Sequence, residues 1–466
     1  MSIASKAAGS ADSANADGAG ADGSATETNE RRRRATDRIG IGLVGCGVVG
    51  TGILHLLEDN RATIEGRLGA PIDVHRIAVA DASKERDPIV PRHKLTADPM
   101  EVVEDADVDI VVEVMGGTNV ASSVLERALD RAKHVVTANK ALIAEQGDRL
   151  LALAESKMVD LYFEAAVAGG IPIIRVLREG LASDRILALR GIVNGTSNYI
   201  LSQMTQQGLE FTDALRGAQE AGYAEADPTL DVGGGDAAHK LAILATLAYG
   251  ARIHPDQILV EGIDRVSAQD IAFASRFGFI IKPLAIGRPT ASGLDLRVHP
   301  ALVRKGSVLG SIHGALNAVY VEGAMVGPCL LSGPGAGALP TAMSVVSDIV
   351  DVGRNMLARA HGRVPSRAVD GANLAETPIA DVREHRSRFY IRLAVQDETG
   401  VLGRVASVLG GFGVSIEQMV QEGDRGDDAT LIILTHEARE GDLREALDEV
   451  ARLSAVGAAQ ALRIEE

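Results

Sequence analysis

The 466-residue chain has only two cysteines, no tryptophan and 3% aromatic residues. Cys46 and Cys329 are too few for a disulfide framework and lack the spacing of metal ligands, so we expect a reducing compartment, the cytoplasm. No apolar run reaches the roughly 18 residues that span a bilayer, and the N-terminus lacks the apolar core of a signal peptide. These absences argue against a secreted disulfide-rich protein and predict no membrane partner.

Basic residues are also in deficit, because 47 Lys and Arg face 63 Asp and Glu, for a formal net charge of −16 at pH 7. Nucleic-acid binding requires a concentrated excess of Lys and Arg. We therefore expect a small-molecule substrate and no nucleic-acid partner. Lysine itself is scarce, with 9 residues against 38 arginines. A lysine placed among acids is informative here, since it can exchange a proton and arginine effectively cannot.

The length and the pattern of apolar residues predict an α/β protein of several domains. Residues 1–37 lack periodicity and predict a disordered tail. Within residues 38–164, short apolar strands alternate with helices and predict a Rossmann-like parallel sheet that binds NAD(P), with strands at Ile39–Val44, Val74–Val79, Asp109–Val114, Val135–Ala138 and Leu161–Phe163.

The rest of the chain predicts two further units. Residues 165–321 read as a mixed α+β substrate-binding and dimerisation domain, with strands at 186–193 and 280–286. Residues 322–375, with a helix at 338–354, are expected to return to the nucleotide domain. A polar linker at 376–388 then leads to residues 389–466, whose pattern is the βαββαβ order of a ferredoxin-like domain.

A glycine-rich loop, Gly45-Cys46-Gly47-Val48-Val49-Gly50, follows the first expected strand and opens a helix. In that context the first glycine permits a tight turn, the second lets the backbone approach a pyrophosphate, and the third lets helix and strand pack closely. The loop predicts a bound NADP or NAD; the alternative is a glycine turn without a ligand. Asp81 is the candidate for the adenosine ribose, while Lys84 and Arg86 could meet a 2′-phosphate, so the choice of cofactor stays open.

The segment from Gly222 to Leu241 carries four carboxylates that we expect to converge on Lys240, namely Glu225, Asp227, Asp231 and Asp236. Asp236 and Lys240 are four residues apart at the start of a helix and so share a face. We expect Lys240 to move a proton to or from a substrate hydroxyl during hydride transfer, and Glu225 and Asp236 to bind a cationic amino group. An amino-acid substrate supplies that group. The alternative is a capped helix start with one surface ion pair worth under ~1 kcal/mol.

A second lysine, Lys140, follows an expected strand in the sequence Thr137-Ala138-Asn139-Lys140. Open α/β sheets place ligands at the carboxyl ends of their parallel strands. Lys140 is therefore a second candidate site residue. The alternative is a solvent-exposed lysine at a helix start.

Together these motifs resemble those of homoserine dehydrogenase with a C-terminal ACT domain. The resemblance runs from Ile39 to the end of the chain. Its specific pieces are the glycine loop, Ala138–Lys140, Asn194–Tyr199, Gly222–Lys240, Gly333–Gly337 and Pro340–Ala342.

The resemblance implies NAD(P)-dependent interconversion of L-homoserine and L-aspartate 4-semialdehyde, in threonine, methionine and isoleucine biosynthesis, with Lys240 as proton donor in the reducing direction. It implies that Lys140 contacts both nicotinamide nucleotide and substrate, and that Glu225 and Asp236 bind the amino acid. It further implies that the cofactor lies against Gly222, Gly335 and Gly337. Ala80 departs from the family pattern, because members that prefer NADP often carry arginine there.

The resemblance also implies a monovalent cation such as Na⁺, held by Glu164, Val167, Gly169 and Ile171. The residues alone show only a glycine turn after a strand, whose carbonyls suit a hard cation. The segment Asp397–Leu402 resembles the start of an ACT module, which implies an end-product effector such as L-threonine. A homo-oligomer paired through the substrate domain is implied as well.

Two other functions compete with this one. A thioester-forming semialdehyde dehydrogenase needs an activated cysteine, but Cys46 belongs to the nucleotide loop and Cys329 has no histidine nearby in sequence. A non-catalytic amino-acid sensor could keep the nucleotide fold. The presence of Lys140, Glu225, Asp236 and Lys240 argues against the sensor.

Overall fold

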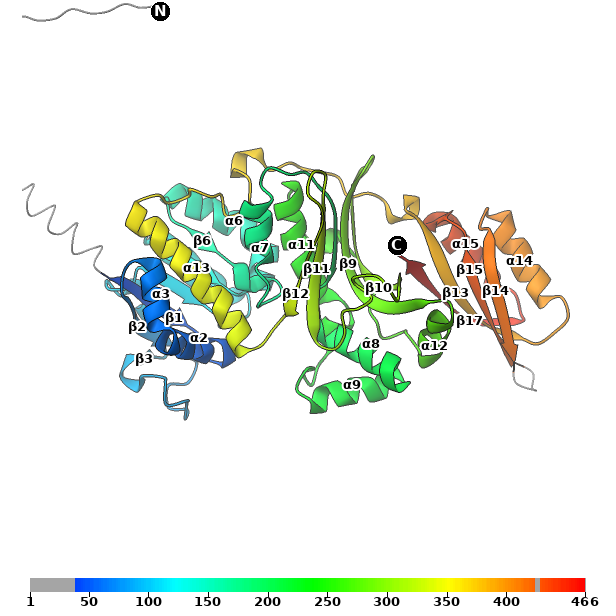
Figure 1. The fold of residues 1–466 in the computed structure, drawn as a ribbon, viewed down its shortest axis with the longest axis horizontal. Coiled ribbons are helices and arrows are strands. Elements are labelled where there is room, and N and C mark those ends of the chain that lie inside the picture. Colours follow the sequence, from blue (N-terminus) through cyan, green and yellow to red (C-terminus); the bar gives the residue numbers. More distant parts are fainter. Residues whose placement is uncertain (1–37, 424–427, 466) are drawn as a thin grey trace, which may run out of the picture.

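The computed structural model describes residues 38–423 and 428–465. The expected tail at residues 1–37 lies outside these described residues. Figure 1 shows three parts in a row: a nucleotide-binding part at one end, a central mixed sheet, and a C-terminal unit at the other end. None of the described helices is both long and apolar enough to cross a bilayer.

The first part is a six-stranded parallel sheet in the order β3-β2-β1-β4-β5-β6. Its strands are β1 Ile39–Val44, β2 Ile72–Ala78, β3 Leu95–Thr96, β4 Ile110–Glu113, β5 His134–Thr137 and β6 Leu161–Tyr162. Its helices are α2 Val48–Asp59, α3 Arg61–Leu68, α4 Pro99–Glu104, α5 Asn119–Asp130 and α6 Lys140–Lys157. The predicted Rossmann-like sheet is confirmed; only β3, two residues long, was missed.

The strand order reverses beside β1, whose neighbours are β2 and β4. Ligands of open α/β sheets bind at such a switch point, outside the carboxyl ends of the strands. The glycine loop leaves β1 there. The topology therefore places the loop where a dinucleotide would bind.

A helix from late in the chain, α13 (Ala338–Ala358), packs on this first part. Its buried face, with Ala342, Val345 and Ile349, belongs to the same core cluster as residues of β1 and α2. A Cβ on Gly52 of α2 would lie 2.9 Å from the Ala338 carbonyl oxygen, so the missing side chain permits the close helix approach. Figure 1 shows α13 alongside α2 and α3.

The central part holds a mixed sheet covered by helices. Its strands are β7 Ile186–Ile192, β8 Leu259–Val260, β9 Phe279–Thr290, β10 Gly293–Arg304, β11 Leu316–Gly323 and β12 Gly327–Pro334. Its helices are α7 Ile173–Arg175, α8 Gly195–Gln207, α9 Phe211–Glu220, α10 Thr229–Val232, α11 Gly235–Tyr249 and α12 Ala268–Arg276. Helix α11 packs against α6 of the first part, so the two parts meet along these helices.

The C-terminal unit has the predicted βαββαβ order, with one short added strand. Its elements are β13 Arg386–Gln396, α14 Val401–Gly411, β14 Ile416–Gly423, β15 Asp428–Thr435, β16 Ala438–Arg439, α15 Glu440–Val450 and β17 Val456–Ile464. Strand β17 pairs in parallel with β10 through Ala301 with Arg463 and Leu302 with Ile464. The central and C-terminal sheets therefore form one continuous sheet.

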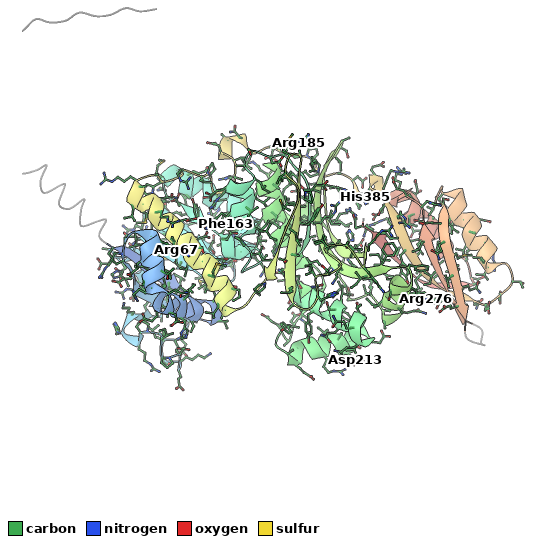
Figure 2. All side chains as sticks on the ribbon, viewed as in Figure 1. Arg67, Phe163, Arg185, Asp213, Arg276 and His385 are labelled. Atoms are coloured by element: carbon green, nitrogen blue, oxygen red, sulfur yellow. The ribbon has the colours of Figure 1, made fainter. Side chains whose placement is uncertain are left out.

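Side chains reinforce this junction. Tyr390 of β13 donates its hydroxyl hydrogen to Asp270 of α12 at 3.0 Å, and Arg392 donates to the same carboxylate at 2.7 Å. Arg276, at the end of α12, forms an ion pair with Glu422 of β14 (Figure 2). The C-terminal unit is thus joined to the central part by strand pairing, by side-chain hydrogen bonds and by ion pairs.

Candidate active site

The glycine loop has the geometry of a diphosphate cradle. Gly45 has a φ of 101°, a left-handed conformation that glycine adopts without strain. A Cβ on Gly50 would lie 2.4 Å from the Gly45 carbonyl oxygen, so the third glycine allows the loop to close on its helix. A Cβ on Gly47 would meet no atom within 4 Å, and α2 begins after Gly47 without a side-chain cap. The first N–H groups of α2 are thus open to an anion.

The segment after β2 approaches this loop. Arg86 donates hydrogen bonds to the carbonyl oxygens of Cys46 at 2.8 Å and Asp81 at 2.9 Å. The Asp81 carboxylate accepts bonds from the Ser83 amide at 2.8 Å and hydroxyl at 2.6 Å. Asp81 and Arg86 therefore lie beside the loop, where the adenosine ribose of a dinucleotide would be bound.

Cys46 is poorly suited to nucleophilic catalysis. Its side chain is buried, and burial raises the pKa of its thiol. A reactive cysteine needs the opposite shift, because the thiolate is the nucleophile. This geometry removes one of the two cysteines that a thioester mechanism could use.

The two candidate lysines meet at one carboxylate. Lys240 donates to Asp236 Oδ2 at 2.7 Å and to the Val193 carbonyl oxygen at 2.7 Å. Lys140, the first residue of α6, places its Nζ 3.1 Å from Asp236 Oδ1. The expected pairing of Asp236 and Lys240 on one helix face is confirmed, and α6 and α11 meet at their N-terminal turns.

Asp236 stays ionised in this cluster. Burial alone would raise its pKa, but the ammonium groups of Lys240 and Lys140 and the Asn194 amide outweigh burial and hold the pKa well below the usual carboxyl range. Its place in the first turn of α11 adds a favourable helix dipole. The carboxylate is thus a fixed negative charge that orients both ammonium groups.

The expectation that four carboxylates converge on Lys240 is wrong. Within the described residues, only Asp236 lies at ion-pair distance from Lys240. Asp231 is linked to the cluster through Asn194, whose amide donates to Asp231 at 2.7 Å and to Asp236 at 2.9 Å. Asp227 is exposed and accepts a bond from the Thr229 hydroxyl at 2.6 Å.

Glu225 is also exposed, on the loop that follows α9. Gly222 starts this loop with a φ of 76°, and the Glu225 carbonyl accepts a bond from Gln219 at 3.1 Å. The side chain of Gln219, on α9, therefore helps to hold the loop at the surface. Among the described residues, Glu225 makes no ion pair with either lysine.

The Gly333–Gly337 turn reaches the lysine cluster through Asn317. A Cβ on Gly335 would lie 2.1 Å from the Asn317 side chain, so only glycine fits there. The Asn317 amide donates to the Val193 carbonyl at 3.0 Å, the same oxygen that accepts from Lys240. Gly337, with a φ of 117°, precedes α13. The turn thus lies between the lysine cluster and the nucleotide-binding part.

The proposed cation residues lie in one buried turn. Both carboxyl oxygens of Glu164 accept backbone N–H groups, from Ile174 at 2.9 Å and Arg175 at 2.8 Å. The Glu164 amide donates to Asp348 at 2.8 Å. Burial, with the neighbouring Asp348 carboxylate, raises the pKa of Glu164, and burial raises that of Asp348. Arg175 places its Nη2 3.4 Å from Asp348 Oδ1, and a further positive charge beside Glu164 would stabilise the ionised pair.

The carbonyl groups of the same turn are oxygen donors of the type that hard cations take. Val167 and Ile171 are buried, and Gly169 has a φ of 36°. The Gly169 carbonyl already accepts a bond from the Ser344 hydroxyl at 2.6 Å. Because a carbonyl oxygen carries two lone pairs, this bond does not prevent cation binding.

Comparisons with known proteins identify the family of the chain. The family model "Homoserine dehydrogenase, NAD binding domain" matches residues 45–164, "Homoserine dehydrogenase" matches residues 172–350, and "ACT domain" matches residues 389–455. Homoserine dehydrogenase of Neisseria gonorrhoeae is 44% identical over 404 residues, covering 86% of this chain and 92% of that protein. That of Pseudomonas aeruginosa is 42% identical over 415 residues, covering 88% and 95%.

The chain belongs to the homoserine dehydrogenase family. A crystal structure of a homoserine dehydrogenase from Thiobacillus denitrificans matches with a TM-score of 0.88 and 43% identity, covering 92% of this chain and 98% of that one. A hyperthermophilic archaeal homoserine dehydrogenase solved in complex with NADPH matches with a TM-score of 0.57 and 27% identity, covering 68% of this chain and 97% of that one. The chain is thus an NAD(P)-binding oxidoreductase with an ACT domain, and the nucleotide loop and lysine cluster described above lie within the matched homoserine dehydrogenase regions.

Two residues of this homoserine dehydrogenase site were given no role by the sequence. Asn194 caps α8, accepting from the Ser197 amide at 2.7 Å, while its amide group holds Asp231 and Asp236. Asn317 is fully buried and shares the Val193 carbonyl with Lys240. Asn194 stood in a motif that was singled out, but Asn317 had no sequence signal at all.

Proposed function

We propose that Lys240 is the proton donor and acceptor of the homoserine dehydrogenase reaction in this chain. An ammonium group has three N–H donors. Asp236 and Val193 fix two of them, at 2.7 Å each, which leaves the third for the substrate oxygen. This geometry of Lys240 is the observation that supports the proposal most strongly.

In the reducing direction, Lys240 donates a proton to the aldehyde oxygen as that carbon receives a hydride, and L-homoserine results. In the oxidising direction, neutral Lys240 takes the hydroxyl proton as the hydride leaves. Bound NADPH or NADH would supply the hydride for reduction, and bound NADP⁺ or NAD⁺ would accept it in oxidation. Asp236 stabilises the protonated lysine and, with Glu225, binds the substrate amino group. Lys140, held by Asp236, contacts the substrate and the nicotinamide nucleotide.

The nucleotide lies, in this proposal, along Gly45, Gly47, Val48, Val49 and Gly50, with Gly222, Gly335 and Gly337 against its nicotinamide end. We propose NADP as the preferred cofactor. Lys84 and Arg86 follow β2, where an arginine near the ribose accommodates a 2′-phosphate in this fold. NADPH in the archaeal relative is in keeping with this preference.

We further propose that Glu164, Val167, Gly169 and Ile171 hold a monovalent cation such as Na⁺. The site would neutralise the buried Glu164 and Asp348 pair beside α7. The test is the thermal midpoint in sodium chloride against tetramethylammonium chloride at equal ionic strength. Stabilisation by sodium that is lost in Glu164→Gln supports the site; equal midpoints in both salts overturn it.

We propose L-threonine as the effector of the ACT domain, and a homo-oligomer that pairs through the central domain. Strand β12 supports this pairing, because it forms the edge of the large sheet and is flanked by exposed Met325 and Val326. Sedimentation velocity of the full chain should show a dimer or larger. A monomer at micromolar concentration overturns the oligomer.

The reaction is tested by absorbance at 340 nm with L-homoserine and NADP or NAD in parallel, with and without L-threonine. We expect growth of reduced cofactor with both, a higher kcat/KM for NADP, and inhibition by L-threonine. Absence of turnover with both cofactors in folded protein overturns the dehydrogenase. A higher kcat/KM for NAD overturns only the cofactor preference.

A further inference from the structure

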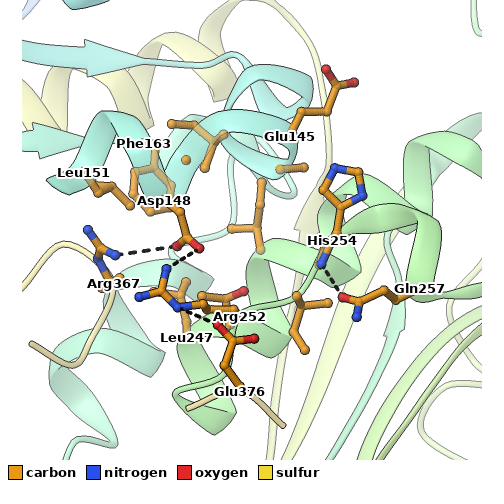
Figure 3. Close-up of a pocket in the computed structure, with 17 residues that line it drawn as sticks. Glu145, Asp148, Leu151, Phe163, Leu247, Arg252, His254, Gln257, Arg367 and Glu376 are labelled. Carbon is orange, nitrogen blue, oxygen red and sulfur yellow. Dashed lines mark hydrogen bonds and ion pairs between the residues drawn. The ribbon is translucent and has the colours of Figure 1, made fainter. Parts of the chain in front are cut away.

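A cavity of about 270 Å³ lies between α6 and α11, away from the lysine cluster. Figure 3 shows its lining, which comes from α6, from α11, from Phe163 after β6 and from the segments that follow α11 and α13. Its apolar wall includes Ile143, Leu151, Phe163, Ile243 and Leu247. The volume is just below the roughly 300–1,000 Å³ of drug-sized ligand sites, so it suits a small ligand with a short apolar body.

The polar side of the cavity carries charges of both signs. Arg252 lies 3.0 Å from Asp148 and 3.1 Å from Glu376, and Arg367 lies 3.5 Å from Asp148 (Figure 3). Glu145 also lines the cavity. Two guanidinium groups and the carboxylates paired with them therefore line one side of the cavity, opposite its apolar wall. A ligand matched to this lining carries one negative and one positive group beside a small aliphatic part.

Arg367 has unused hydrogen-bonding capacity. Its side chain is only 2% exposed, yet Nε and Nη2 make no hydrogen bond within the described part of the chain. Nη2 lies 3.2 Å from Glu155 Oε1, close enough for an ion pair but not aligned for a hydrogen bond. Buried donors without acceptors destabilise the folded protein. The nitrogen that approaches the cavity-lining Asp148 is Nη1, at 3.5 Å, so the guanidinium reaches the cavity through Nη1.

The backbone next to Arg367 has an unusual conformation. Ala368 has a φ of 66°, which is uncommon for a residue other than glycine. The same segment is anchored to the end of α11, because Arg252 donates its amide hydrogen to the Ala375 carbonyl at 3.0 Å and Ala375 donates to Gly250 at 2.8 Å. Strain of this kind is often retained at ligand-binding positions.

We propose that this cavity binds a small aliphatic α-amino acid. Its carboxylate would bind Arg252 and Arg367, its ammonium group would bind Asp148 and Glu145, and its side chain would lie against the apolar wall. The cavity is separate from the lysine cluster, so binding does not depend on the proposed catalytic roles. The cavity lies between α6, which begins at Lys140, and α11, which carries Lys240 in its second turn, so its occupant would contact both helices that carry the lysine cluster.

The test is calorimetric titration of the full chain with L-alanine, L-valine, L-leucine and L-isoleucine. We expect saturable binding of at least one, and at least tenfold weaker binding of the matching carboxylic acid and amine, each of which lacks one charged group. Arg252→Gln removes one guanidinium from a side chain that is 41% exposed and so should fold. Ala144→Leu fills the cavity from α6. Each variant should weaken binding at least tenfold.

Arg127→Gln is the matched control, because Arg127 of α5 is 46% exposed and pairs with Glu104 of α4, and neither residue lines the cavity. Its binding should equal that of the wild type. Absence of binding by all four amino acids overturns the proposal. Binding that survives unchanged in Arg252→Gln and Ala144→Leu also overturns it, because the ligand then occupies another site such as the lysine cluster or the ACT domain.

Discussion

Replacement of Lys240 by methionine removes the ionisable group and keeps an unbranched apolar side chain. The substrate oxygen then loses the group that donates or takes its proton. General acid–base catalysis contributes about 10²–10⁴-fold, so we expect kcat to fall by that factor, equivalent to about 3–5 kcal/mol in the activation barrier. The assay is reduced-cofactor absorbance at saturating L-homoserine and NADP.

The fold should tolerate this change. Asp236 keeps Lys140 at 3.1 Å and the Asn194 amide at 2.9 Å, so its buried charge is not left alone. Removing one partner of an isolated buried pair costs about 3–5 kcal/mol, and the loss in unfolding free energy should be below that range. Binding of NADPH, followed by the fluorescence of the reduced nicotinamide, should survive.

Lys157→Met is the matched control. Lys157 ends α6, where it makes a surface ion pair with Asp130 at 3.0 Å. Its loss should leave kcat within about twofold of the wild type, since exposed pairs are worth ~1 kcal/mol or less and touch no substrate. A Lys240→Met enzyme that retains more than a tenth of wild-type kcat, or a Lys157→Met enzyme that loses as much as Lys240→Met, refutes the assigned role.

Three further predictions address the cofactor, the pH and the ACT domain. Gly50→Ala places a Cβ 2.4 Å from the Gly45 carbonyl and displaces the start of α2, so the Kd for NADPH should rise about tenfold or more in fluorescence titration; an unchanged Kd contradicts the cradle. His385, beside the central sheet (Figure 2), has its pKa lowered from 6.5 to about 4 by burial and by Arg297. As the pH falls, His385 takes up a proton in the unfolded chain before it does so in the folded protein. The free energy of unfolding is therefore at its full value above pH 6.5 and falls by about 3 kcal/mol as the pH drops to about 4. His385→Gln should lose less stability over that range in denaturant titrations, and a parallel loss in both proteins rules this out. Glu261 accepts bonds from Arg463 of β17 at 2.6 and 3.0 Å, and its carbonyl oxygen would lie 3.7 Å from a Cβ on Gly234, between α10 and α11. Glu261→Gln should raise the L-threonine concentration for half-inhibition at least about threefold. Unchanged inhibition excludes coupling through the Glu261–Arg463 ion pair.

The elements that the sequence predicted best have strong local signals. The strand Ile39–Val44 was predicted with its observed bounds, because a parallel strand buried on both faces is a continuous apolar run that ends at the glycine loop. The pairing of Asp236 with Lys240 followed from their spacing of four in one helix. The βαββαβ order of the C-terminal unit followed from alternation and turns. Each depends on contacts between residues near in sequence.

The errors and omissions lie where distant segments meet. Four acids close in sequence were expected around Lys240, but Glu225 and Asp227 lie exposed on the loop after Gly222, and Asp231 of α10 reaches the cluster only through Asn194. No role was assigned from the sequence to Asn317, which reaches the Val193 carbonyl from another strand. It also could not show that β17 pairs with β10 and joins the ACT unit to the central sheet.

By itself, therefore, the sequence determined the nucleotide loop, the helices that carry Lys140 and Lys240, and the family, since these depend on local spacing and motif. Only the tertiary structure decided that both lysines share one carboxylate, and that α6 and α11 enclose a charged cavity behind them. The physical reason is that such sites form from side chains of separate elements, whose distances are set by helix and sheet packing and leave no periodic trace along the chain.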